Sequence, residues 1–258
     1  MQEIKTDCSL GIVCSPKNGS YLINLLNSIS ACKSRPSNIM VFFNEYKEDL
    51  REALDYSVSF GADIFVYNKI QPLARLWNQS ILMSKNEKYS LIFNEDTIIN
   101  DTEFFEKIDY YHNINPFVVK YCEAMSAFSV TKDLIKEVGW FDENYLWCWE
   151  DSDYFIRMCK KNIKPYHVNP EPVNHLRSLG QNGYKIHQSR WNLGMNFFYQ
   201  KWDIKKIIED NNLSFKLDEN CESSKRNLLL NGFFCGYFYD NFAAKVNQRI
   251  ETPNYYVL

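Results

Sequence analysis

A short acidic stretch follows an apolar run and carries residue types suited to chemistry. Asn94, Glu95 and Asp96 come directly after the apolar residues 91–93, a pattern that predicts a short buried strand with carboxylates at its C-terminal end. Ligands of open α/β sheets bind at that end of the strands, so Asp96 would lie where a nucleotide or a metal ion is held. Taken alone, the stretch also fits an ordinary acidic turn.

A second acidic pair, Glu150 and Asp151, lies in the first turn of a helix predicted to begin there. Acidic side chains are favoured at a helix N-terminus because they complement the helix dipole. A carboxylate pair beside Trp147 and Trp149 is more than capping requires, and the flat indole rings suit sugar faces as well as a protein core.

Three further residues become informative only in combination. Arg75 and Asn78 stand close together near the start of a helix predicted over residues 73–83, and His175 follows the loop at 169–172. Separately, Arg75 fits a surface ion pair, and a lone histidine is more often a packed or loop residue than a ligand.

Strands alternate with helices in the first hundred residues. Because parallel neighbours need a long crossover, this alternation predicts a parallel sheet with helices on both faces. The expected strands are 9–14, 39–43, 64–67 and 89–93, and the expected helices are 21–29, 50–58 and 73–83. Four strand ends then meet at one edge of the sheet, which Ser15, Asn44, Asn68 and Asn94 would line.

The pattern changes after Glu103. We expect a helix over 104–111, strands over 117–122 and 126–130, a helix capped by Thr131 and a further strand over 165–168, with helix again from 185 through 202. Residues 1–202 therefore form the predicted main domain. Residues 203–258 form a helical C-terminal extension whose apolar stretch at 228–234 would pack on the domain, form a homodimer face or touch a membrane surface, packing being favoured.

Composition limits the class of protein. A net charge of -3 and a pI near 5.9 give no general attraction to nucleic acid, and no basic patch is apparent. The eight cysteines are scattered without a Cys-x-x-Cys pair, which favours reduced thiols over disulfides or a zinc site. With no signal-peptide pattern and no apolar run of about 18 residues, we expect a cytoplasmic protein, soluble or peripherally membrane-associated.

In order and spacing, these segments together resemble a glycosyltransferase of the GT-A (Rossmann-like) fold, most similar to the large inverting family 2 group. Residues 91–96 resemble the Asp-x-Asp motif, preceded by Arg75 and Asn78 as in the family's Arg-Asn helix. Residues 126–130, 138–143 and 149–153 are similar to the acceptor-side stretch that ends in Glu-Asp. His175 stands where metal-dependent members often place a histidine ligand.

The resemblance implies a mixed, mostly parallel sheet flanked by helices, with a nucleotide-sugar half over about 1–100 and an acceptor half over about 101–202. It implies transfer of a sugar from a nucleoside-diphosphate sugar to a hydroxyl of a glycan or glycolipid. Mn²⁺ or Mg²⁺, held by Asp96 and His175, would neutralise the diphosphate, and Mn²⁺ tolerates this mixed oxygen and nitrogen shell.

The same resemblance assigns roles to the remaining residues. Asp151 would be the general base of an inverting displacement, and Glu150 would bind a sugar hydroxyl or orient that base. Trp147 and Trp149 would stack on donor or acceptor sugar. The expected donor-binding residues are Ser15, Asn44, Arg75, Asn78, Asn94, Glu95 and Asp96.

Two departures from the family pattern leave the donor open. Asn94 replaces the first acid of Asp-x-Asp, and Asn44 stands where relatives place an aspartate that reads the base. The nucleotide of the donor therefore stays open among uridine, guanosine and thymidine. Two other functions are kept: a catalytically silent member that binds glycan or a partner protein, and a sugar nucleotidyltransferase. The latter is disfavoured because residues 15–19 are too poor in glycine for a phosphate loop.

Overall fold

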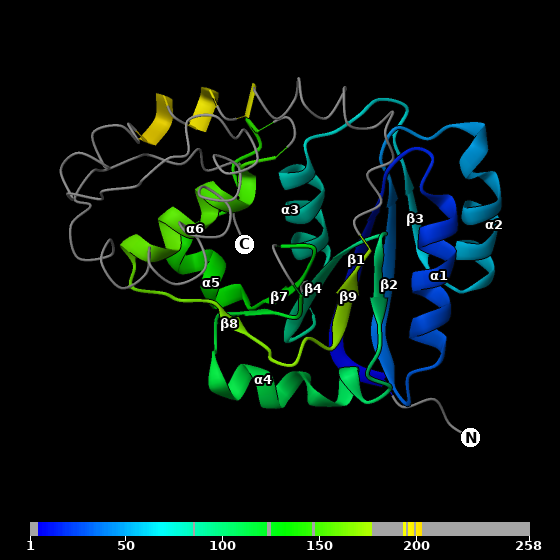
Figure 1. The fold of residues 1–258 in the computed structure, drawn as a ribbon, viewed down its shortest axis with the longest axis horizontal. Helices are drawn as coiled ribbons and strands as arrows, with labels where there is room; N and C mark the ends of the chain where they lie inside the picture. The colour runs from blue at the N-terminus through cyan, green and yellow to red at the C-terminus, as the bar shows by residue number, and fades with distance from the viewer. Residues whose placement is uncertain are drawn as a thin grey trace, which may run out of the picture.

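A seven-stranded sheet in the order β3-β2-β1-β4-β7-β6-β8 forms the centre of the computed structural model (Figure 1). The structure describes residues 5–84, 86–122, 125–145, 148–176, 193–194, 196–198 and 200–202. The predictions for Trp147 and for residues 203–258 lie outside these residues. The boundary of the main domain at residue 202 stays a prediction.

The sheet is mixed and mostly parallel, as predicted. Its strands are β1 (Lys5–Cys14), β2 (Arg35–Phe43), β3 (Asp63–Val66), β4 (Tyr89–Asn94), β6 (Val118–Lys120), β7 (Ala127–Val130) and β8 (Tyr166–His167). The first four pair in parallel, and β8 is parallel to β6. Strand β7 runs antiparallel to both β4 and β6, so it begins at the edge where β4 ends.

Helices cover both faces of the sheet and create two hydrophobic cores. The helices are α1 (Gly19–Ser30), η1 (Glu48–Leu50), α2 (Arg51–Ser59), α3 (Leu73–Met83), η2 (Phe104–Lys107), α4 (Ile108–Ile114), α5 (Lys132–Val138) and α6 (Glu150–Lys160). Helices α1, α2 and α4 share one core, whereas α3, α5 and α6 share the other. Figure 1 shows α1 and α2 on one side of the sheet and α3, α5 and α6 on the other.

The central strands feed both cores because their side chains alternate. Leu91 and Phe93 of β4 pack with α1, while Ile92 between them packs with α3. Gly11 in β1 allows α3 to approach closely, since a Cβ there would lie 2.0 Å from Ser80 Oγ. This packing fixes α3 against the strands whose ends form the site.

Most predicted elements are present with shifted ends. Helix α3 begins and ends where the periodicity predicted. The helix expected over 104–111 is instead divided between η2 and α4. Thr131 occupies the N-cap position of α5 as predicted, but its hydroxyl donates to Pro116 O at 2.9 Å and makes no capping hydrogen bond to the helix.

A second sheet of two strands was not expected. Strand β5 (Thr97–Ile99) pairs antiparallel with β9 (Val173–His175), with Thr97 opposite His175. Each strand has only three residues, too few for an alternating pattern to be recognised. Among the helices of the described ranges, none has the length and apolar character needed to cross a membrane.

Candidate functional site

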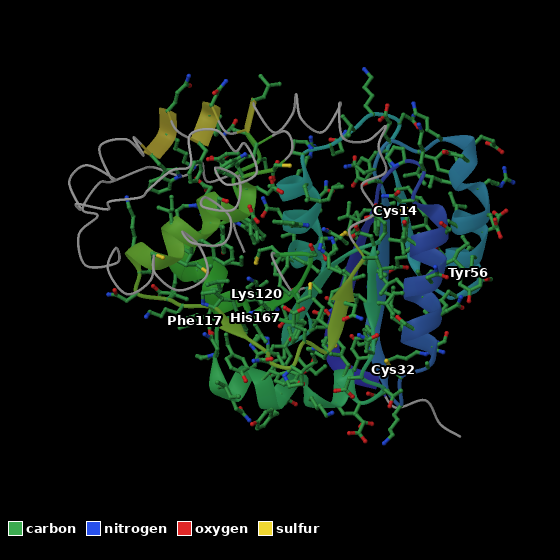
Figure 2. All side chains as sticks on the ribbon, viewed as in Figure 1. Cys14, Cys32, Tyr56, Phe117, Lys120 and His167 are labelled. Atoms are coloured by element: carbon green, nitrogen blue, oxygen red, sulfur yellow. The ribbon has the colours of Figure 1, made fainter. Side chains whose placement is uncertain are left out.

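The ends of β1, β2, β3 and β4 meet at one edge of the sheet. Cys14 pairs with Phe43, Phe43 pairs with Val66, and Val13 pairs with Asn94. The register therefore aligns the residues that follow these strands at one edge. Figure 2 shows Cys14 at that end of β1, well separated from Cys32 at the opposite end of α1. The rim predicted from the sequence is present.

Glu95 ties the loop after β1 to the end of β4. Its Oε1 accepts hydrogen bonds from the Ser15 amide at 3.1 Å and from Asn18 Nδ2 at 2.7 Å. The side chain is buried, and burial, followed by the charge of Asp96, raises the pKa of Glu95 to about 7 against the opposing effect of these hydrogen bonds. Glu95 therefore fixes the loop between β1 and α1.

Asp96 meets His175 because β5 pairs with β9. Asp96 Oδ2 lies 3.3 Å from His175 Nε2, and the Leu176 amide donates to Asp96 O at 2.7 Å. Ser126 Oγ lies 3.3 Å from His175 Nδ1. Both Asp96 and His175 are largely buried, so the two sequence-predicted metal ligands converge at the carboxyl edge of the sheet.

The chemistry of this pair of side chains fits a divalent ion. A carboxylate oxygen and an imidazole nitrogen suit Mn²⁺, which accepts a mixed shell. The residues that the structure describes contain no group of three or more histidines, cysteines and acids able to hold an ion. Asp96 and His175 would therefore supply two ligands, and oxygens of a bound diphosphate and water would have to complete the shell.

Asn94 lies beside Asp96 with its backbone fixed by two bonds. Its amide donates to Ser126 O at 2.8 Å, and its carbonyl accepts from Thr97 Oγ1 at 2.8 Å. The side chain is half-buried at the rim. This brings β4, β5 and the start of β7 together at one point, with the carboxamide in the place of the family's first acid.

The amides of Asn44 and Asn78 are engaged in bonds within the protein. Asn44 is fully buried, donates to Gln71 O at 3.0 Å and accepts from the Gln71 amide at 2.7 Å. Asn78 Nδ2 donates to Phe141 O at 2.9 Å and to Glu143 Oε1 at 2.9 Å. Asn78 Oδ1 accepts from the Phe141 amide at 3.0 Å. These geometries position loops, and the expected nucleotide contacts of the two residues stay predictions.

Arg75 is the exposed member of the predicted Arg-Asn helix. Its Nη1 donates to Gln71 Oε1 at 3.2 Å, next to the segment that Asn44 holds. The guanidinium is therefore presented at the surface near the sheet edge, where an anionic group could reach it.

Helix α6 begins with a strained turn. Cys148 and Trp149 have φ values of 68° and 76°, the left-handed region that non-glycine residues seldom adopt. Trp149 is 2% exposed and its ring lies 5.0 Å from that of Phe198. This is the environment of a core residue, and stacking of Trp149 on a sugar would require the ring to move.

The two acids that open α6 have different surroundings. Asp151 Oδ1 accepts from the Ser152 amide at 2.7 Å and from Ser152 Oγ at 3.3 Å. Burial raises the pKa of Asp151, opposed by Ser152 and by the positive charge of Lys120. Burial, and next the charge of Asp151, raises the pKa of Glu150 to about 8. Glu150 Oε2 has no hydrogen-bond partner among the described residues.

A buried ion-pair network holds the C-terminal end of the described chain against α6. Asp153 accepts from Arg157 Nε at 2.9 Å and from Trp202 Nε1 at 2.9 Å, and Lys201 Nζ lies 2.6 Å from it. Lys201 also pairs with Asp142 at 2.6 Å. Asp153 thus has a structural role, and it fixes the helix that carries Glu150 and Asp151.

Sequence reasoning missed three residues of this region. Asn18 and Ser126 are polar residues of loops with no distinguishing pattern. Lys120 stands in the middle of an apolar run at 117–122, which is an unusual place for a lysine and was a usable signal. Its proximity to Asp151 is visible only in the tertiary structure.

Comparison with known proteins gives similarity at the level of fold. No family model matches the chain, and no curated protein matches it. A mannosyltransferase from Pyrobaculum calidifontis, solved in complex with GDP-Man and Mn²⁺, has a TM-score of 0.56 at 9% identity, covering 72% of this chain and 61% of its own. GalNAc-T7, solved with UDP, GalNAc and Mn²⁺, has a TM-score of 0.56 at 10% identity, covering 86% and 54%.

TarS from S. aureus has a TM-score of 0.54 at 9% identity, covering 92% of this chain and 44% of its own. The chain therefore spans less than two thirds of the length of each of these proteins. At such low identity the likeness concerns the fold, and the fold agrees with the sheet order and helix layers described above. The chain has the GT-A-like fold found in these glycosyltransferases.

Proposed function

We propose that the protein is an inverting glycosyltransferase that moves a sugar from a nucleoside-diphosphate sugar to a hydroxyl of a glycan or glycolipid. The observation that carries the proposal is the meeting of Asp96 and His175, 3.3 Å apart, at the carboxyl edge of the sheet. The pairing of β5 with β9 thus brings together two side chains of types that bind divalent ions. The GT-A-like fold supports the same reading.

Asp96 and His175 would hold the divalent ion. When bound, the ion supplies Lewis-acid neutralisation of the charge that develops on the departing diphosphate. Ser126 Oγ lies within hydrogen-bond reach of the His175 ring and orients it, a supporting contact of the kind that fixes ligand histidines. The buried Glu95 fixes the loop at Ser15 and Asn18, which would lie along the nucleotide.

Asp151 would act as the general base. The acceptor oxygen forms a bond to the anomeric carbon on the face opposite the diphosphate, and the bond from that carbon to the diphosphate oxygen breaks with its electron pair on the diphosphate. The proton of the acceptor hydroxyl passes to Asp151. A single displacement of this kind inverts the anomeric centre. Because Oδ1 is bonded to Ser152, Oδ2 is the oxygen left for the proton.

The decisive experiment combines donor binding with product analysis. Melting temperatures are measured with a panel of UDP, GDP and dTDP sugars, with and without Mn²⁺, because a ligand that binds only the folded state raises the melting temperature. A nucleotide sugar that stabilises the protein only with Mn²⁺, followed by release of nucleoside diphosphate, supports the proposal. Absence of stabilisation by every donor would exclude it.

A glycan- or partner-binding protein without activity is the second candidate. Asn94 in place of an acid favours it, as do the internal bonds that occupy the Asn44 and Asn78 amides. Such a protein would be stabilised by a glycan and would release no nucleotide. A sugar nucleotidyltransferase would instead release pyrophosphate from a nucleoside triphosphate and a sugar phosphate.

A further inference from the structure

Lys120 is a buried lysine in a strand that is otherwise apolar. Lys120 is 7% exposed. Its backbone in β6 pairs with Phe128 of β7 on one side and with His167 of β8 on the other. Figure 2 shows Lys120 and His167 next to each other on these neighbouring strands. Burying an ammonium group is unfavourable unless a negative charge or a polar partner offsets it. The fold must therefore offset the cost of burying the Lys120 ammonium group.

The ammonium group lies over Phe155, in the second turn of α6. Lys120 Nζ is 5.5 Å from the centre of the Phe155 ring. Asp151 precedes Phe155 by four residues, so the two side chains share one face of the helix, one turn apart. Glu150 is rotated by about 100° from Asp151 around the helix axis. Lys120 thus lies over the face of α6 that carries Asp151 rather than Glu150.

Local hydrogen bonds also distinguish Asp151 from Glu150. Asp151 receives two hydrogen bonds from Ser152, while Glu150 Oε2 receives none from the described residues. The positive charge of Lys120 lowers the pKa of Asp151, which burial raises, whereas the causes that shift the pKa of Glu150 do not include Lys120. Neighbouring groups whose surroundings push their pKa values apart take different roles in acid-base chemistry.

We propose that Lys120 keeps Asp151 in the ionised form that accepts a proton, and thereby makes Asp151 rather than Glu150 the base. Lys120 is in this sense a positioning residue that acts through Asp151. Glu150 remains protonated and is available to donate a hydrogen bond to a sugar oxygen. The inference rests on the proposed function, in which Asp151 takes the proton of the acceptor hydroxyl.

The other titratable groups around Lys120 are few in the described part of the chain. Cys122 lies two residues along, and burial raises the pKa of its thiol to about 12, so it stays neutral. His167 on β8 pairs with Glu171 at 2.9 Å and is about half exposed. The charge of Lys120 lowers the pKa of the Asp151 carboxyl and that of the Cys122 thiol, and of these two groups Asp151 is the one that can ionise near neutral pH.

The test follows the ionisation of Asp151 directly. The side-chain carboxyl carbons of aspartate are labelled with ¹³C, the Asp151 signal is assigned with Asp151→Asn, and pH titrations are recorded for wild type, Lys120→Met, Lys120→Gln and Lys120→Arg. We expect both neutral variants to raise the Asp151 midpoint, and Lys120→Arg to retain the wild-type midpoint, because the positive charge of Lys120 lowers the Asp151 pKa.

Lys160→Met is the matched control. Lys160 also lies on an aromatic ring, with Nζ 4.8 Å from the Trp202 ring centre. It stands nine residues beyond Asp151, about 13 Å along the helix axis. This variant should leave the Asp151 midpoint unchanged. An unchanged midpoint in both neutral Lys120 variants would overturn the inference, as would an equal shift in Lys160→Met.

The pH dependence of kcat provides the second readout. With a donor identified by the panel above, Lys120→Met should move the acid limb upward by the same amount as the NMR midpoint, with little change in the KM for donor. A shifted midpoint without turnover on any donor would contradict the proposed function and leave the role of Lys120 intact. Turnover with an unshifted midpoint and acid limb would contradict the role of Lys120 and leave the function intact.

Discussion

The dipeptide Glu-Asp follows β4 as Glu95-Asp96 and opens α6 as Glu150-Asp151, with different surroundings. In both pairs the glutamate is buried, with 5% and 4% of its surface exposed. Burial raises the pKa of Glu95 to about 7 and that of Glu150 to about 8. The aspartate of the first pair meets His175, and that of the second accepts a hydrogen bond from the Ser152 amide.

The partners of the four carboxyl groups differ. Glu95 accepts two hydrogen bonds and fixes a loop, whereas Glu150 has an oxygen without a partner among the described residues. Asp96 meets an imidazole that itself can bind a metal, whereas Asp151 meets a hydroxyl, an amide and the charge of a lysine. In the proposed function, the same dipeptide therefore supplies a metal ligand in one place and a base in the other.

The largest effect should follow from removing the base of the second pair. Asp151→Asn is expected to reduce turnover on the order of 10²–10⁴-fold and to leave donor binding intact, because the amide cannot accept the proton. Glu150→Gln should reduce turnover by less than about tenfold, since an amide replaces a protonated carboxyl and about one hydrogen bond is at stake. Release of nucleoside diphosphate measures both. Near wild-type rates for Asp151→Asn would exclude it as the base.

The first pair is tested through its metal dependence. Asp96→Ala and His175→Ala should each remove the stabilisation that a donor gives only with Mn²⁺, which is about 2.7 kcal/mol at a hundred times Kd. His167→Ala is the matched control, because His167 also pairs with a carboxylate, Glu171, at 2.9 Å but lies on β8. Melting temperatures with donor, with and without Mn²⁺, provide the measurement. Retained Mn²⁺ dependence in both variants would exclude this ligand pair.

Glu150 should also make stability depend on pH. Its folded pKa of about 8 lies above the ordinary value of 4.5, so its contribution to stability is complete below pH 4.5 and is lost as pH rises through 8. Glu150→Gln should therefore gain stability relative to wild type between pH 5 and 8, by about 3 kcal/mol. Urea denaturation at the two pH values measures this. A constant difference would show that Glu150 ionises normally.

His112 offers a smaller effect of opposite sign. It is buried beside Ser129, whose Oγ lies 2.6 Å from Nε2, and burial lowers the pKa of His112 to about 4. Its contribution is present above the unfolded pKa of about 6.5 and is lost as pH falls through 4. The stability of wild type relative to His112→Gln should fall by about 2 kcal/mol from pH 6.5 to 4.5. A difference that does not change with pH would contradict this.

The sequence allowed the elements that order the sheet to be predicted because they are long enough to show a pattern. Helix α3 has apolar residues every three or four positions over its whole length, and the end of β4 is marked by the change from apolar residues to Glu95 and Asp96. The sequence could not show β5 and β9, because three-residue strands owe their existence to each other rather than to local preference.

By itself, the sequence determined which carboxylates and which histidine stand at the ends of elements, since residue type and hydrophobic period are local properties. Only the tertiary structure decided their partners. It paired Thr97 with His175 and so placed the imidazole at Asp96, and it turned Lys120 toward the face of α6 that carries Asp151. The physical reason is that the pKa and the role of a charged group depend on burial and on neighbours distant along the chain.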